Sequence, residues 1–132
     1  MNDRANPSHV IRLNAAWERI ETADDHSIVR SSKVSLPDAL PFSDATTHVC
    51  YQRKFNAPTG LTDSDALLVE SDFLGYAETV TLNDRSLLTD AHDNTADIKS
   101  MLQSFNQLRV TLPVSLAEKT RSATARLLIY SV

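Results

Sequence analysis

The densest group of side chains that could do chemistry lies between residues 90 and 97. Asp90, His92, Asp93, Asn94 and Asp97 place carboxylates, an imidazole and an amide in one short segment. Oxygen-rich loops of this kind hold calcium or bond the hydroxyls of a sugar, so Asp90, His92, Asp93 and Asn94 are the candidate binding residues. The segment lacks the glycine and the terminal glutamate of an EF-hand. The competing interpretation is a solvated loop in which Asp97 caps a helical turn.

Nucleophilic catalysis is the second chemistry that the residue types suggest. Ser43, Asp44 and His48 are the types of a hydrolytic triad and lie close together in the sequence. The chain has only two glycines, Gly60 and Gly75, which stand far apart. A nucleophile elbow, a Walker loop and a dinucleotide-binding loop each need closely spaced glycines. The sequence therefore predicts no catalytic residue.

Metal and acid–base sites find equally little support. The paired carboxylates Asp24/Asp25 and Asp63/Asp65 fall in apparent loops, where such groups face water rather than a buried reaction site. Histidines at a metal-ligand spacing do not occur, and Cys50 is the only cysteine. We expect no metal site, no cofactor and no enzymatic activity.

Composition limits the class of protein. A chain of 132 residues predicts a single domain, 1–132, with residues 1–8 flexible. Thirteen basic and seventeen acidic residues give a net charge of −4, which suits neither nucleic acid nor an anionic membrane surface. The sequence offers no apolar run of about 18 residues and no apolar stretch after Met1 that could serve as a leader. Taking Met1 as the native start, we expect a cytoplasmic protein.

Short apolar runs separated by polar turns indicate an all-β chain. Leu108, Val110 and Leu112 alternate with polar residues, which is typical of a half-buried strand. Pro113 should end that strand because it lacks a backbone donor. Further strands are predicted at 49–55, 67–69, 76–82 and 127–130, the last of them central in its sheet. This spacing, almost without long helices, favours an antiparallel sandwich.

Turns and helices are predicted at a few places only. Asn83 and Asp84 tolerate positive φ and separate two strand-like runs, so a tight hairpin is expected there. Asp97 precedes apolar residues at helical spacing, which predicts one short helical turn near Ile98–Leu102. The proline-containing segment 35–47 is expected to be a covering loop. For residues 14–21, helix propensity competes with the start of a strand.

Several short motifs follow one another in a fixed order. They are Leu13-Asn14-Ala15-Ala16-Trp17, Tyr51-Gln52-Arg53-Lys54-Phe55, Val80-Thr81-Leu82-Asn83-Asp84, Asp97-Ile98-Lys99-Ser100-Met101-Leu102, Asn106-Gln107-Leu108-Arg109-Val110 and Arg126-Leu127-Leu128-Ile129-Tyr130. In this order the chain resembles the sugar-binding, N-terminal jelly-roll domain of glycoside hydrolase family 2 enzymes, a galactose-binding-domain-like sandwich. The resemblance implies that 14–21 begins a strand with Trp17 in the core.

The departures from the family concern function. A glycine-rich, aromatic stretch of the family is replaced by 88–95, and a long loop of the family is reduced to 113–124 without any aromatic residue. The catalytic barrel that carries the family's glutamates is not part of these 132 residues. The resemblance implies a non-catalytic module with weak carbohydrate binding. The alternatives are a protein-interaction or structural module, with self-association as one form, and an accessory domain acting with a separate hydrolase chain.

Aromatic side chains would decide between these functions, since a sugar ring stacks on an exposed aromatic face. Of the eight aromatic residues, five fall in predicted strands or at their starts. Phe73 and Phe105 lie in turns of the kind that pack into the core, so both are expected to be structural. Phe42, in the covering loop, is the aromatic residue least committed to the core.

Overall fold

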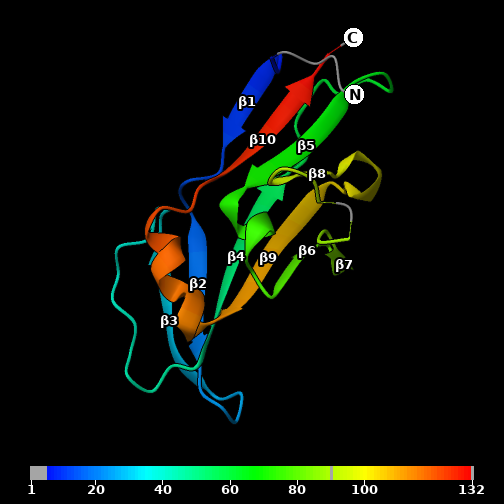
Figure 1. The fold of residues 1–132 in the computed structure, drawn as a ribbon. Helices are drawn as coiled ribbons and strands as arrows, with labels where there is room; N and C mark the ends of the chain where they lie inside the picture. Colours follow the sequence, from blue (N-terminus) through cyan, green and yellow to red (C-terminus); the bar gives the residue numbers. More distant parts are fainter. Residues whose placement is uncertain (1–5, 90, 132) are drawn as a thin grey trace.

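The structure of the protein is a computed structural model that describes residues 6–89 and 91–131. Most of the segment 1–8, for which flexibility is expected, lies outside these residues. The described strands form two antiparallel sheets that pack face to face (Figure 1). Sheet A has the order β1-β10-β5-β8 and sheet B the order β3-β2-β4-β9-β6-β7. The predicted all-β, antiparallel jelly-roll sandwich is therefore confirmed.

In the described part of the chain the strands follow in the order β1 to β10, with three 3₁₀ helices between them. Their bounds are β1 His9–Arg12, β2 Trp17–Thr22, β3 Ile28–Val34, β4 His48–Asn56, β5 Ala66–Ser71, η1 Asp72–Gly75, β6 Thr79–Leu82, β7 Arg85–Ser86, β8 Thr95–Asp97, η2 Lys99–Met101, β9 Phe105–Pro113, η3 Val114–Arg121 and β10 Ala125–Tyr130. Strands β4, β5, β6, β9 and β10 correspond to predicted runs, and β10 is central in sheet A. Pro113 is the last residue of β9, as expected.

The ambiguous segment 14–21 forms a strand. Trp17 begins β2 and is only 1% exposed, and its Nε1 donates a hydrogen bond to the carbonyl of Leu13. Ala16, immediately before it, has φ 66° and turns the chain from β1 into β2. Tertiary packing of Trp17 thus outweighs the helix propensity of the segment.

Two local predictions are confirmed in detail. Asn83 and Asp84 have φ 51° and 67° and join β6 to β7 as a primed hairpin turn, with Leu82 opposite Arg85. The helical turn after Asp97 is the 3₁₀ helix η2, and the Asp97 carboxylate accepts a hydrogen bond from the Lys99 amide at 3.0 Å.

Other elements are not evident in the sequence. The edge strands β1 and β3 lack alternation because an edge strand exposes much of its surface, and β7 and β8 are too short to show a pattern. The short connection 113–124, for which the sequence predicts no element, contains the 3₁₀ helix η3. Tyr76 lies before β6 rather than within it. These elements depend on pairing and on contacts with distant residues.

The core lies between the sheets around Phe73, which is fully buried in η1. Its ring is 5.5 Å from that of Tyr51, 5.9 Å from that of Tyr76 and 6.2 Å from that of Trp17, distances typical of packed aromatic pairs. The described strands of sheet A do not extend over β2 and β3 of sheet B. There the loop 35–47 and η3 lie over sheet B (Figure 1). The Asp38 amide donates to the carbonyl of Thr120, which joins this loop to η3.

Candidate functional site

The candidate loop forms a tight turn between β7 and β8, so far as it is described. Asp90 lies outside the described residues. His92 and Thr95 exchange backbone hydrogen bonds of 2.8 and 2.9 Å around Asp93 and Asn94, whose φ values are 51° and 63°. This is the geometry of a two-residue primed turn, in which aspartate and asparagine tolerate positive φ. The local reason for these residue types is therefore the backbone conformation.

The side chains of the turn do not converge on one point. His92 Nε2 lies 3.1 Å from Asp93 Oδ2, and both side chains are more than four-fifths exposed. Asn94 turns back to the fold, where its carbonyl accepts from the Ser71 amide and its Oδ1 covers Gly75. A Cβ at Gly75 would come 2.8 Å from that oxygen, so a side chain at this position would displace the Asn94 side chain. Binding by these residues stays a prediction.

The possible triad of Ser43, Asp44 and His48 is not assembled in the described structure. The Ser43 amide donates to Glu21, and His48 Nδ1 lies 3.4 Å from Thr47 Oγ1. Among residues 6–89 and 91–131, no group of three or more histidine, cysteine, aspartate or glutamate residues is placed to hold a metal ion. No helix in this part is long and apolar enough to cross a bilayer.

A buried network of charged groups lies under the covering loop. Arg19 and Glu21 project from β2 toward the interior and are fully buried, and Asp38 of the loop is 2% exposed. Arg19 Nη1 donates to Asp38 at 2.6 Å and to the carbonyl of Leu40 at 2.7 Å, and its Nη2 lies 3.3 Å from Glu21. The Tyr51 hydroxyl donates to the same Asp38 carboxylate at 2.6 Å.

Electrostatics show that this network is structural. Burial alone would raise the pKa of Glu21, but hydrogen bonds from Arg30, the Ser43 amide and Thr46, with the charge of Arg19, lower it to about 2. Burial and the bond to Asp38 raise the pKa of the Tyr51 hydroxyl. Glu21 therefore stays ionised at neutral pH, and the bonds from Arg19 to Asp38 and to the Leu40 carbonyl hold the loop 35–47 on β2.

The sequence suggests that Phe105 packs into the core and that Phe42 is the ring least committed to it, and the structure shows the reverse for these two rings. The ring of Phe42 contacts two guanidinium groups, with Arg19 Cζ 4.2 Å and Arg121 Cζ 5.2 Å from its centroid. Phe105, expected to pack into the core, is 79% exposed at the start of β9. The expectation for Phe105 is therefore wrong, because its side chain points to the solvent face of sheet B.

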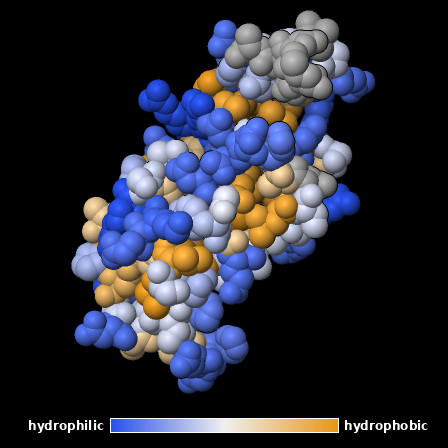
Figure 2. All heavy atoms as spheres, in the orientation of Figure 1, coloured by the Kyte–Doolittle hydropathy of each residue, from blue (hydrophilic) through white to orange (hydrophobic). Residues whose placement is uncertain are grey.

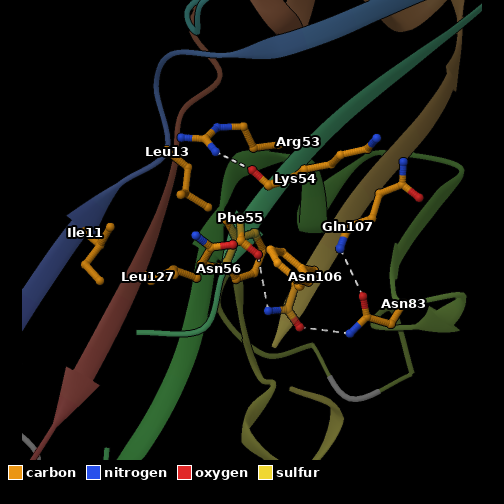
Figure 3. Close-up of a pocket in the computed structure, with 11 residues that line it drawn as sticks. Ile11, Leu13, Arg53, Lys54, Phe55, Asn56, Asn83, Asn106, Gln107 and Leu127 are labelled. Atoms are coloured by element: carbon orange, nitrogen blue, oxygen red, sulfur yellow. Dashed lines mark hydrogen bonds between the residues drawn. The ribbon is translucent and has the colours of Figure 1, made fainter. Parts of the chain in front are cut away.

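An open groove of about 670 Å³ lies beside Phe105. One wall comes from sheet A and the segment after β1, and the other from the end of β4 and the start of β9 (Figure 3). No acidic residue lines it in the part of the chain that the structure describes. Its described lining residues are Ile11, Leu13, Arg53, Lys54, Phe55, Asn56, Asn83, Phe105, Asn106, Gln107 and Leu127.

The solvent face of sheet B supplies the polar part of the groove, which we call the platform: Phe105, Asn56, Lys54 and Gln107. Asn56 pairs with Phe105 and Lys54 with Gln107 across β4 and β9, so all four side chains share a face. Among the described residues, no hydrogen bond involves the side-chain amide of Asn56 or the ammonium group of Lys54. Gln107 Nε2 donates to Gln52 at 3.2 Å, and no hydrogen bond among the described residues uses the side-chain carbonyl oxygen of Gln107. The platform thus combines an exposed ring with donors and acceptors.

The buried Asn106 side chain positions Phe105. Its Oδ1 accepts from the Gln103 amide at 2.9 Å and from Asn83 Nδ2 at 3.0 Å. Its Nδ2 donates to the carbonyls of Gln103 at 2.9 Å and Phe55 at 3.3 Å. Since Gln103 and Asn106 stand on either side of Phe105 in the sequence, these bonds hold the backbone that carries the exposed ring. Figure 3 shows the Asn83–Asn106 pair below the groove.

The core-facing part of the groove, which we call the mouth, consists of Ile11, Leu13, Leu127, Phe55 and Arg53. Arg53 Nε donates to the carbonyl of Ala15 at 2.6 Å, and its Nη1 to the carbonyl of Lys54 at 2.5 Å. It makes no ion pair with any described residue, and burial lowers its pKa. The Arg53 and Lys54 side chains run in opposite directions (Figure 3). The mouth is therefore apolar with one uncompensated cation.

Sequence reasoning identified neither the platform nor the buried network. Arg53 belongs to one of the short motifs, but it makes no ion pair with a described residue. Arg19, which lies outside these motifs, is the arginine that pairs with the buried Asp38. An asparagine directly after Phe105 is the only local signal of the platform, and its meaning depends on Asn83, which is distant in the sequence.

No family model matches the sequence, and no curated protein is significantly similar to it. Solved structures are similar in fold. The FMN-binding β-glucuronidase from Facaelibacterium prausnitzii L2-6 aligns with 93% of this chain and 22% of its own, at 14% identity and a TM-score of 0.63. The β-glucuronidase of Bifidobacterium dentium, solved with coumarin-3-O-glucuronide, aligns with 86% of this chain and 21% of its own, at 20% identity and a TM-score of 0.58.

These likenesses concern architecture. At 14% and 20% identity they show the fold, and the chain spans about a fifth of the length of either enzyme. The resemblance to a domain of glycoside hydrolase family 2 is thus supported at the level of fold, without specifying which domain. The chain has the β-sandwich fold of one part of these β-glucuronidases.

Proposed function

We propose that the chain is a non-catalytic accessory module that binds carbohydrate weakly at the platform. The observation that carries the proposal is Phe105, 79% exposed on a strand whose backbone is held by the buried Asn106 side chain. An aromatic ring fixed in this way presents its face to a sugar at little cost in conformational entropy. Asn56, Lys54 and Gln107 beside it supply donors and an acceptor for sugar hydroxyls.

The non-catalytic part of the proposal is supported by the types of residue that line the groove. Glycoside hydrolysis in most families needs two carboxyl groups about 5 to 10 Å apart across the scissile bond. The described residues that line the groove include no aspartate or glutamate. The β-glucuronidase neighbours carry this fold in about a fifth of their chains, which is consistent with an accessory role.

A titration followed by two-dimensional amide NMR tests the proposal. Methyl β-glycosides of galactose, glucose and glucuronic acid are added to the chain up to tens of millimolar. This range detects weak binding, with a binding free energy no more favourable than about −4 kcal/mol. We expect saturable shifts at residues 54–56 and 105–107 for at least one sugar. Phe105→Ala should abolish them, whereas the matched control Ile28→Ala, which truncates a side chain 67% exposed on β3, should not.

The same titration distinguishes the turn from the platform. A double variant Asp93→Ala/Asn94→Ala should leave sugar binding unchanged if the platform binds, and should abolish it if the turn does. Shifts confined to residues 92–95 would assign binding to the turn and refute the platform. No saturable shift with any sugar would refute carbohydrate binding and leave the interaction module as the surviving function.

A further inference from the structure

One edge of sheet A is β1, a strand that pairs, among the described residues, on one side only, with β10. The Leu13 amide donates to the carbonyl of Ala125 at 2.9 Å, directly after the last β1 pair. Hydrogen-bonded pairs alternate in antiparallel sheets, so Ile11 also bonds toward β10, while the backbone groups of Val10 and Arg12 point away from it. All four β1 residues are exposed, with Val10 at 42% and Ile11 at 37%.

Sheet A also leaves part of the mouth, at Ile11, uncovered. Ile11 pairs with Leu127, which is 1% exposed, so both side chains face the interior. Ile11 nevertheless remains more than a third exposed, because no further strand of the described chain continues sheet A beyond β1. A strand added along β1 would cover Ile11 and direct alternate side chains into the mouth.

Charge indicates the chemistry of such a strand. The chain is acidic overall, at −4, yet β1 contains His9 and Arg12 and no acidic residue, and the described lining of the groove contains none. Arg12 and Arg53 form no ion pair with any described residue. Arg12 follows Ile11 in the strand and therefore points to the outer face of sheet A, opposite to the mouth that contains Arg53. A carboxylate on the outward-facing side of an added strand would be complementary to Arg12.

We propose that an extended acidic peptide segment of another protein adds to sheet A as a fifth strand along β1. The segment places apolar side chains against Ile11 in the mouth and a carboxylate beside Arg12 on the outer face of sheet A. Pairing of two copies of this chain through β1 is disfavoured, because antiparallel pairing of this strand with itself supplies only basic groups and no carboxylate. The interaction does not depend on sugar binding at the platform.

The test uses blocked seven-residue peptides in which valine alternates with glutamate, serine or lysine. Amide NMR and fluorescence anisotropy report binding to the whole chain. We expect the glutamate peptide to bind, with shifts at residues 9–13, and to bind about tenfold more tightly than the lysine peptide. Val10→Pro, which removes only an outward-facing amide, should weaken binding by about tenfold. The matched control Val10→Thr should retain it.

A charge reversal keeps the test decisive if proline disturbs β1. Arg12→Glu alters an exposed side chain and should invert the preference, so that the lysine peptide binds better than the glutamate peptide. Binding without charge preference, or the absence of shifts at 9–13, would overturn the proposal. A dimer seen by light scattering and lost in Val10→Pro would also overturn it, by assigning β1 to self-association. Sugar titrations, read at Phe105, remain an independent measurement.

Discussion

The substitution Glu21→Gln tests directly how much the buried network stabilises the fold. The carboxylate is fully buried and accepts hydrogen bonds from Arg30 Nε at 2.6 Å, the Ser43 amide at 2.8 Å and Thr46 Oγ1 at 2.8 Å. Glutamine keeps the shape but removes the charge and turns one acceptor into a donor. That donor must face another donor, and two guanidinium groups lose their shared anion.

The magnitude follows from the pKa and from buried ion pairs in general. The shift of the Glu21 pKa from 4.5 to about 2 corresponds to about 3 kcal/mol of native-state stabilisation at neutral pH. Removing one partner of a buried ion pair costs about 3 to 5 kcal/mol. A small domain is stable by about 5 to 15 kcal/mol in total, so the variant should lose a large fraction of its stability.

The sign of the pH dependence also follows. Because the folded pKa of Glu21 lies below the unfolded value, its contribution is fully present above about pH 4.5 and is lost as pH falls toward about 2. The difference in stability between wild type and Glu21→Gln should therefore be largest at neutral pH. It should shrink progressively below about pH 4.5, while other carboxylates affect both proteins alike.

Urea unfolding followed by far-ultraviolet circular dichroism, at neutral and at acidic pH, measures both effects. The matched control is Glu70→Gln, because Glu70 pairs with Arg126 on the surface, where the side chains are 33% and 45% exposed. An exposed pair contributes less than about 1 kcal/mol. Thr46→Val, which removes one neutral donor to Glu21, should cost about 1 kcal/mol and remain folded. Equal losses in Glu21→Gln and Glu70→Gln, or a difference that does not vary with pH, would refute the reasoning.

Three further predictions concern backbone conformation and one buried hydroxyl. Ala16→Gly should stabilise the fold by up to about 1 kcal/mol because Ala16 has φ 66°, whereas Ala15→Gly should destabilise it by about 0.5 kcal/mol through added unfolded-state entropy; thermal unfolding compares the two. Asp84→Gly should raise the melting temperature, since glycine suits φ 67° in the hairpin turn better than aspartate, and an unchanged or lower value would contradict this. Tyr51→Phe should cost about 1 to 3 kcal/mol in urea unfolding because it removes a 2.6 Å bond to the buried Asp38, and a loss below about 0.5 kcal/mol would mean that the bond contributes little.

Strands with strict alternation were predictable from the sequence. Leu108, Val110 and Leu112 bury one face of β9, and this period-two pattern is a local property that needs no knowledge of the partner strand. The hairpin at Asn83 and Asp84 was predictable for a similar reason, since positive φ is a preference of the residues themselves. Edge strands such as β1 and β3 were not, because their sequences are not constrained by burial on one face.

The candidate site was predictable only in part. The residue types at His92, Asp93 and Asn94 stand out in the sequence, but the same types serve a primed turn, and composition cannot separate the two roles. The exposure of Phe105 and the coverage of Phe42 could not be inferred. Each depends on which face of the sheet a loop crosses, and that depends on contacts between segments far apart in the chain.

The sequence by itself determined the class of fold, the positions of the alternating strands, the tight turns and the lack of glycine-rich catalytic loops, because these follow from periodicity and local backbone preference. Only the tertiary structure decided that Arg19 and Glu21 are buried, that Asn106 holds an exposed Phe105, and that β1 leaves sheet A open above Ile11. Burial and exposure depend on what other segments cover a residue, and those segments are brought together only by folding.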